Sequence, residues 1–112
     1  MRNGRLELFG LKTCDTCRKA RRALDAAGYD VSFTDIRDTP IDPAQLEIWL
    51  AEFGPTLLNT RSTTWRGLEE ATKQQAPLEL LATYPALMKR PLIEHDGVLY
   101  LGWSKAVQGE LL

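Results

Sequence analysis

Apolar and polar residues follow two different periods at the start of the chain. Residues 6–9 form a short apolar run that ends at Gly10, which predicts a β-strand. The next segment predicts a helix ending at Gly28, because its apolar residues recur every three or four positions, at Cys17, Ala20, Leu24 and Ala27. Residues 29–36 alternate and predict a second strand. This order is a βαβ unit with a right-handed parallel crossover.

The middle of the chain has helical patterns. Asp42-Pro43 is a typical helix start, and Gly54-Pro55 ends the apolar spacing that follows it. A polar loop at 57–64 precedes three short helical segments, expected at 65–71, 77–83 and 85–88. The first of these is weakened by a glycine at position 67.

The last part predicts a hairpin and a helix. Residues 91–95 and 98–102 flank Asp96-Gly97, a pair typical of a type I′ turn, and Ser104 can cap a final helix. We therefore expect one α/β domain over residues 1–112: a βαβ unit, a helical insertion at about 42–88, then ββα. Its four-stranded mixed sheet should have the strand order 2-1-3-4, with strands 3 and 4 antiparallel.

Composition narrows the class of function. With 14 Lys and Arg against 15 Asp and Glu, the net charge is −1, so we expect neither nucleic acid nor a membrane as a partner. From Met1 onward we see no apolar leader and no membrane-spanning stretch, so we expect a cytoplasmic monomer. A zinc site is disfavoured because His95, expected at the surface, is the one histidine. We expect no bound cofactor.

The two cysteines, Cys14 and Cys17, lie where the first strand turns into the helix. Positions i and i+3 share a helix face, so the two thiols can meet. A C-x-x-C at such a turn is typical of a thioredoxin-like redox site. A helix N-terminus should activate Cys14 as the nucleophile, whereas Cys17 should be buried and act second. The alternative is a pair of inert helix residues; Thr13 or Asp15 is expected to accept hydrogen bonds at the helix start.

Arg90-Pro91 and Arg61 are further candidates for the site. Opposite a C-x-x-C turn, we expect a cis Arg90–Pro91 bond that turns neighbouring backbone N–H and C=O groups toward the thiol. If Arg61 and Arg90 converge, their guanidinium groups suit an oxyanion or the carboxylates of glutathione. The alternative is that both are ordinary salt-bridge partners. Lys12 and Thr13, beside the cysteines, are weaker candidates for substrate binding.

Three segments, at residues 8–22, 57–65 and 89–93, resemble a known family in the same order and over essentially the whole chain. This is the ArsC/Spx/YffB family, the arsenate-reductase-like branch of the thioredoxin fold. The Cys-Asp-Thr opening and the Asn-Thr-Arg-Ser-Thr-Thr-Trp segment look most like its YffB subgroup. The resemblance implies a thioredoxin-like fold and a nucleophilic Cys14, with Arg61 and Arg90 around it binding an anion or thiolate.

Departures from the family pattern bear on function. Arsenate reductases of this class carry a further arginine near the last strand, whereas residues 99–104 contain none, so an arsenate ion would lack one expected clamp. The second cysteine, Cys17, resembles Spx, a regulator that binds RNA polymerase and switches by a disulfide, although Spx-type chains continue beyond the final helix. We therefore expect a glutathione-dependent thiol oxidoreductase, with glutathione or a thiol/disulfide substrate as partner. The alternatives are an arsenate reductase and an Spx-like regulator.

Overall fold

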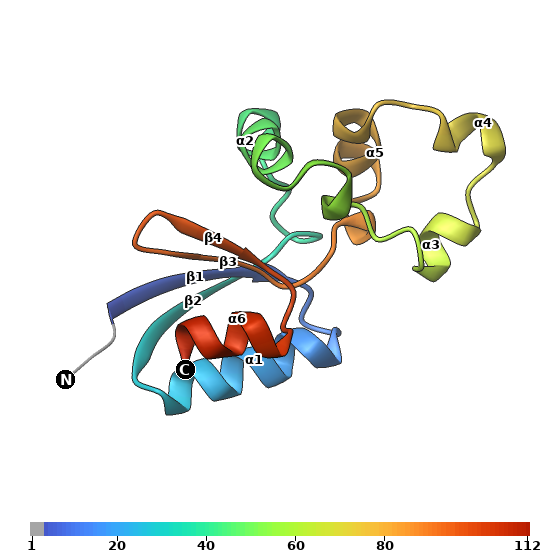
Figure 1. Ribbon diagram of the computed structural model, residues 1–112. Helices are drawn as coiled ribbons and strands as arrows, with labels where there is room; N and C mark the ends of the chain where they lie inside the picture. Colours follow the sequence, from blue (N-terminus) through green and yellow to red (C-terminus); the bar gives the residue numbers. More distant parts are fainter. Residues whose placement is uncertain (1–3) are drawn as a thin grey trace. The chain divides into compact units, whose positions relative to one another are not determined.

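The computed structural model describes residues 4–112, and its helices and strands are shown in Figure 1. In chain order they are β1 (Gly4–Gly10), α1 (Asp15–Ala26), β2 (Tyr29–Asp35), α2 (Pro43–Phe53), the 3₁₀ helix η1 (Gly54–Leu57), α3 (Thr63–Arg66), α4 (Glu70–Lys73), α5 (Pro77–Thr83), the 3₁₀ helix η2 (Pro85–Leu87), β3 (Leu92–His95), β4 (Val98–Leu101) and α6 (Lys105–Leu111). None of the described helices is long and apolar enough to span a membrane.

The described chain forms two compact units. Residues 4–35 and 90–112 make the first, here called the sheet unit, and residues 36–89 make the second, the helical unit. The helical insertion predicted at about 42–88 falls within the helical unit. That the two units fold as a single domain stays a prediction.

The sheet unit contains a four-stranded mixed sheet in the order β2-β1-β3-β4, which confirms the predicted topology. β1 and β2 are parallel, with a register that runs from Gly4 opposite Tyr29 to Gly10 opposite Asp35. β3 is antiparallel to both β1 and β4. The carboxyl ends of β1 and β2 therefore lie together, beside the turn that leads into α1.

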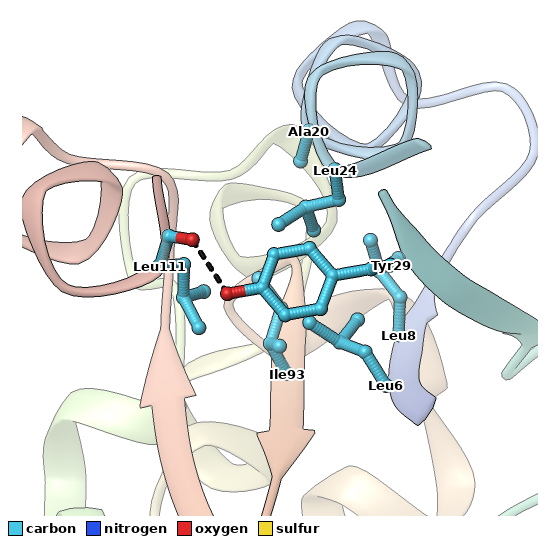
Figure 2. Packing of buried hydrophobic residues seen from close by; sticks show 7 residues of the cluster. All are labelled: Leu6, Leu8, Ala20, Leu24, Tyr29, Ile93 and Leu111. Carbon is cyan, nitrogen blue, oxygen red and sulfur yellow. Dashed lines mark hydrogen bonds between the residues drawn. The ribbon is translucent and has the colours of Figure 1, made fainter. Parts of the chain in front are cut away.

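Helices α1 and α6 cover one face of this sheet (Figure 1). The core beneath them consists of Leu6, Leu8, Ala20, Leu24, Tyr29, Ile93 and Leu111 (Figure 2). A fully buried leucine of this kind contributes about 1.5–3 kcal/mol. The Tyr29 hydroxyl donates a hydrogen bond of 2.5 Å to the Leu111 carbonyl, which ties the end of α6 to the start of β2.

Turn and cap residues in the sheet unit act as predicted. Gly28, just after α1, has φ +94, and both Asp96 (φ 51) and Gly97 (φ 78) have the positive φ that a type I′ hairpin requires. Ser104 accepts a hydrogen bond from the Val107 N–H at 3.3 Å and caps α6. His95, predicted at the surface, is half-buried: its side chain is 15% exposed and its ring meets Tyr29 edge-on.

The helical unit is packed around apolar residues of α2, α5 and the 3₁₀ segments. Its buried members are Ile36, Leu46, Trp49, Leu57, Leu80, Leu81, Leu87 and Met88. The Asp42 carboxylate accepts a hydrogen bond from the Ala44 N–H at 2.9 Å and so caps α2, while α5 has the predicted bounds.

The single helix predicted at 65–71 is wrong, and part of the predicted loop at 57–64 is helical. The Ser62 hydroxyl accepts a hydrogen bond from the Trp65 N–H at 3.1 Å, so α3 already starts at Thr63. It ends after one turn at Gly67, and Glu69 adopts an extended conformation before α4. A strong cap upstream and a glycine downstream thus divide the segment into two short helices.

Candidate active site

Cys14 lies at the start of α1, in the turn that follows β1. Its N–H donates to the Leu11 carbonyl at 3.0 Å, and its own carbonyl accepts the first helical hydrogen bond, from the Arg18 N–H at 3.1 Å. Cys14 itself is therefore the N-cap residue, which corrects the expectation that Thr13 or Asp15 caps the helix. The first N–H groups of α1 have no acceptor within the helix and favour negative charge at this position.

The surroundings of the half-buried Cys14 thiol favour its thiolate. Burial acts to raise its pKa, but this effect is outweighed by the backbone N–H and the thiol of Cys17, followed by the Arg90 guanidinium. The net result is a Cys14 pKa below its ordinary value. Since the thiolate is the reactive form of cysteine, Cys14 has the electrostatic surroundings of a nucleophile.

Cys17, one turn further along α1, is buried, with 1% of its surface exposed. Burial is the main cause that raises the pKa of its thiol to about 12, and the neighbouring Cys14 sulfur acts in the same direction. Its sulfur packs against the backbone of Gly10, where an added Cβ would overlap it. Only a glycine at the end of β1 therefore leaves room for this thiol.

The two cysteines are free thiols, and their pKa values are shifted in opposite directions. The proton stays on Cys17, and the negative charge is favoured on Cys14. Such a pair can attack a disulfide through Cys14, and Cys17 can attack the resulting bond only after it has lost its proton. Among residues 4–112, no group of three or more His, Cys, Asp or Glu side chains is arranged to hold a metal ion.

Arg90 and Pro91 lie just before β3, and the peptide bond between them is cis, as predicted. Arg90 is half-buried and its guanidinium acts on the Cys14 sulfur, so these two residues of the predicted site do meet. Pro91 is buried. Its carbonyl accepts a hydrogen bond from the Gly102 N–H at 2.8 Å, and its role in substrate binding stays a prediction.

The remaining predicted residues lie in two places. Lys12 and Thr13 are exposed in the turn before Cys14. Arg61 is exposed in the helical unit, where it lines a pocket of about 320 Å³ together with Lys89. Its convergence with Arg90 stays a prediction.

Two residues that hold the site were missed by sequence reasoning. The Asp35 carboxylate, at the end of β2, accepts a hydrogen bond from the Lys12 N–H at 2.9 Å and so holds the turn before Cys14. Gly10 makes room for Cys17. Both could have been suspected from topology, because parallel β1 and β2 end at the same edge of the sheet and Gly10 pairs with Asp35 there.

Comparison with known proteins identifies relatives with a similar sequence and fold. The YFFB (PA3664) protein is 36% identical, with a TM-score of 0.87 over 96% of this chain and 98% of its own. An arsenate reductase (ArsC) related protein from Brucella melitensis is 33% identical, with a TM-score of 0.74 over 98% of this chain and 93% of its own. The predicted thioredoxin-like fold and the likeness to YffB are thereby confirmed.

A regulatory protein, MgsR from Bacillus subtilis, is 31% identical over 116 aligned residues, which cover 96% of this chain and 87% of the regulator. The model of the ArsC family matches residues 9–110, from the end of β1 to the last turn of α6. This match includes the cysteine turn, the helical unit and the Arg90–Pro91 segment. The chain therefore belongs to the ArsC family.

Proposed function

We propose that the protein is a glutathione-dependent thiol oxidoreductase with Cys14 as its nucleophile. The observation that carries this proposal is the charge arrangement at the cysteine pair. Cys14 is accessible and its pKa is lowered, while Cys17 beside it is buried and keeps its proton. The proposed reducing, cytoplasmic location suits this chemistry, because thiols stay free there.

In the proposed cycle the substrate is a mixed disulfide between a peptide and glutathione. The Cys14 thiolate attacks the glutathione sulfur, forms a Cys14–glutathione disulfide and releases the peptide thiolate, which takes up a proton. The thiolate of a second glutathione then attacks the bound glutathione sulfur. This step forms glutathione disulfide and restores the Cys14 thiolate. In the net reaction the peptide sulfur is reduced from disulfide to thiol, and the sulfur of the second glutathione is oxidised from thiol to disulfide.

Cys17 offers a second way to complete the cycle. It can attack the Cys14 sulfur, pass its proton to the departing glutathione and form a Cys14–Cys17 disulfide that two further glutathione molecules reduce. Burial is the main reason for the raised pKa of Cys17, and burial persists after Cys14 has reacted. The smaller contribution from the Cys14 sulfur is lost at that stage. We therefore propose glutathione as the main resolving thiol.

Arg90 and Arg61 are assigned different parts of substrate binding. Arg90 stabilises the Cys14 thiolate and the thiolate that leaves from it, since its guanidinium already acts on this sulfur. Arg61, which lines the polar pocket of the helical unit with Lys89, is proposed to bind an anion there. Thr13 and Lys12, exposed before Cys14, would line the approach to the thiolate.

Turnover of a glutathionylated peptide, coupled to glutathione reductase, tests the proposal. We expect activity in the native protein, none in Cys14→Ser, and retained activity in Cys17→Ser. Arsenate is offered in parallel as the alternative substrate, because one structural relative is an arsenate reductase related protein. Absence of turnover with the peptide refutes the thiol reductase; absence with arsenate as well refutes both enzymatic functions.

The relative MgsR favours one candidate of another class, a regulator switched by oxidation of Cys14 and Cys17. In that case the disulfide would change the affinity for RNA polymerase, and turnover would be unimportant. Binding of the purified polymerase to the oxidised and reduced protein separates the two classes. A regulator shows redox-dependent binding that is lost in Cys17→Ser, whereas the proposed enzyme shows none.

A further inference from the structure

A pocket of about 150 Å³ lies beside Cys17, between the N-terminal part of α1 and the edge strand β2. Its lining consists of Leu11, Lys12, Cys17, Arg18, Arg21 and Phe33. Three of these side chains are cationic, and no carboxylate occurs among the described residues of the lining. Neither Cys14 nor Arg90 is among the lining residues. The pocket is therefore separate from the nucleophilic sulfur of Cys14 but lies next to Cys17.

Both arginines of this pocket have a side-chain partner. The Arg21 guanidinium lies over the Phe33 ring, 5.2 Å from its centroid, in a cation–π contact. Arg18 forms an ion pair with Asp15, which fixes its side chain along the first turn of α1. Lys12 is part of the turn that Asp35 holds through a backbone hydrogen bond. Such restriction lowers the entropy cost of binding an anion.

Charge around the pocket is opposite to that of the chain as a whole. Helix α1 carries four cationic residues against two carboxylates, although the whole protein has a net charge of −1. Besides the lining arginines, Lys19 and Arg22 are exposed on the same helix. The helix thus has a local excess of positive charge that extends beyond the pocket.

The size of the pocket limits what fits into it. A volume of about 150 Å³ suits one carboxylate with its methylene groups beside the apolar Leu11 and Phe33. We infer that this pocket binds the side-chain carboxylate of an acidic residue next to the disulfide of a peptide or protein substrate.

This inference rests on the proposed function, and two matched peptides test it. Each contains one glutathionylated cysteine, flanked by glutamates in one peptide and by glutamines in the other. We expect the native protein to have a KM for the glutamate peptide about three- to tenfold lower, which corresponds to roughly 0.7–1.4 kcal/mol. Arg21→Gln should abolish this preference, and added salt should weaken it.

Arg22→Gln is the matched control, because it removes the same charge from an exposed position of α1 outside the pocket. It should keep at least half of the preference. If both variants lost the preference for the glutamate peptide to the same extent, the pocket proposal would be overturned, and the positive charge of the whole helix would be the cause of the preference. An unchanged preference in Arg21→Gln, or a raised KM for glutathione alone, would overturn it as well; the latter result would assign the pocket to glutathione.

A binding measurement keeps the inference separate from the proposed function. Both peptides are labelled with a fluorophore and carry serine in place of the cysteine, so they cannot react, and their anisotropy reports affinity. Tighter binding of the glutamate peptide that disappears in Arg21→Gln supports the pocket even if no turnover is found. Equal binding of both peptides to the native protein refutes the pocket, whatever the activity.

Discussion

Replacing Gly10 with alanine tests how tightly Cys17 packs against the end of β1. A Cβ built at Gly10 would overlap the Cys17 sulfur and lie 3.3 Å from the Cys17 Cβ. The backbone of Gly10 is outside the left-handed region, so alanine itself fits the local conformation. The substitution therefore perturbs one contact, and its cost should depend on the thiol.

The expected magnitude follows from two opposing effects. Alanine in place of glycine at a compatible position stabilises by about 0.4–1 kcal/mol, because the unfolded chain loses freedom. Overpacking in a well-packed core costs about 1–3 kcal/mol. We expect the overlap to prevail and Gly10→Ala to lower the free energy of unfolding by about 1–2 kcal/mol. In a Cys17→Ala background the sulfur is absent, and the cost should fall to near zero.

Urea denaturation followed by far-UV circular dichroism gives the free energy of unfolding of the native protein, the two single variants and the double variant. The four values form a double-mutant cycle, from which we expect an interaction energy of about 1–2 kcal/mol between positions 10 and 17. The reasoning is refuted if Gly10→Ala costs the same with and without the Cys17 thiol, since the overlap would then not be the cause.

Three further predictions concern the electrostatics of the site. Arg90→Gln should raise the pKa of Cys14, seen as a shift to higher pH in the alkylation of Cys14 by iodoacetamide; an unchanged profile would contradict the role of Arg90. Asp35→Ala should lower the free energy of unfolding in urea by about 1.5 kcal/mol, because the Lys12 N–H loses its acceptor. Asp35→Asn keeps an oxygen at this position and should cost less. Equal costs of the two variants would argue against this hydrogen bond. The pKa of Cys17 is raised in the folded state to about 12, so the unfolded chain releases this proton first, and the free energy of unfolding should fall from about pH 9 toward pH 12. Cys17→Ala should reduce this fall. An identical slope in this variant would refute the assignment.

Local sequence signals determined most of the secondary structure. The spacing of Cys17, Ala20 and Leu24 placed α1, and Asp96-Gly97 placed the hairpin, because side-chain periodicity and turn geometry act between near neighbours in the chain. The same signals led to the correct strand order. They failed between residues 62 and 73, where the Ser62 cap and Gly67 divide a segment that spacing alone presents as one helix.

The candidate site was determined by the sequence only as a set of residue types. The C-x-x-C turn identified Cys14 and Cys17, and the order of their pKa values follows mainly from the burial of Cys17 and from the hydrogen bonds that Cys14 receives. Which distant groups surround them depended on the tertiary structure. Arg90 acts on the Cys14 sulfur because β3 pairs with β1, which brings together residues far apart in sequence.

The roles of Gly10 and Asp35 show most clearly what the sequence alone does not reveal and the tertiary structure decides. In the sequence, one is a glycine at the end of a strand and the other an acidic residue before a loop, and neither type is specific for a redox site. In the fold, the parallel pairing of β1 and β2 sets them opposite each other, where one makes room for the Cys17 thiol and the other holds the Lys12 N–H. Close approach and hydrogen bonding across strands are decided by sheet register, which short-range spacing does not encode.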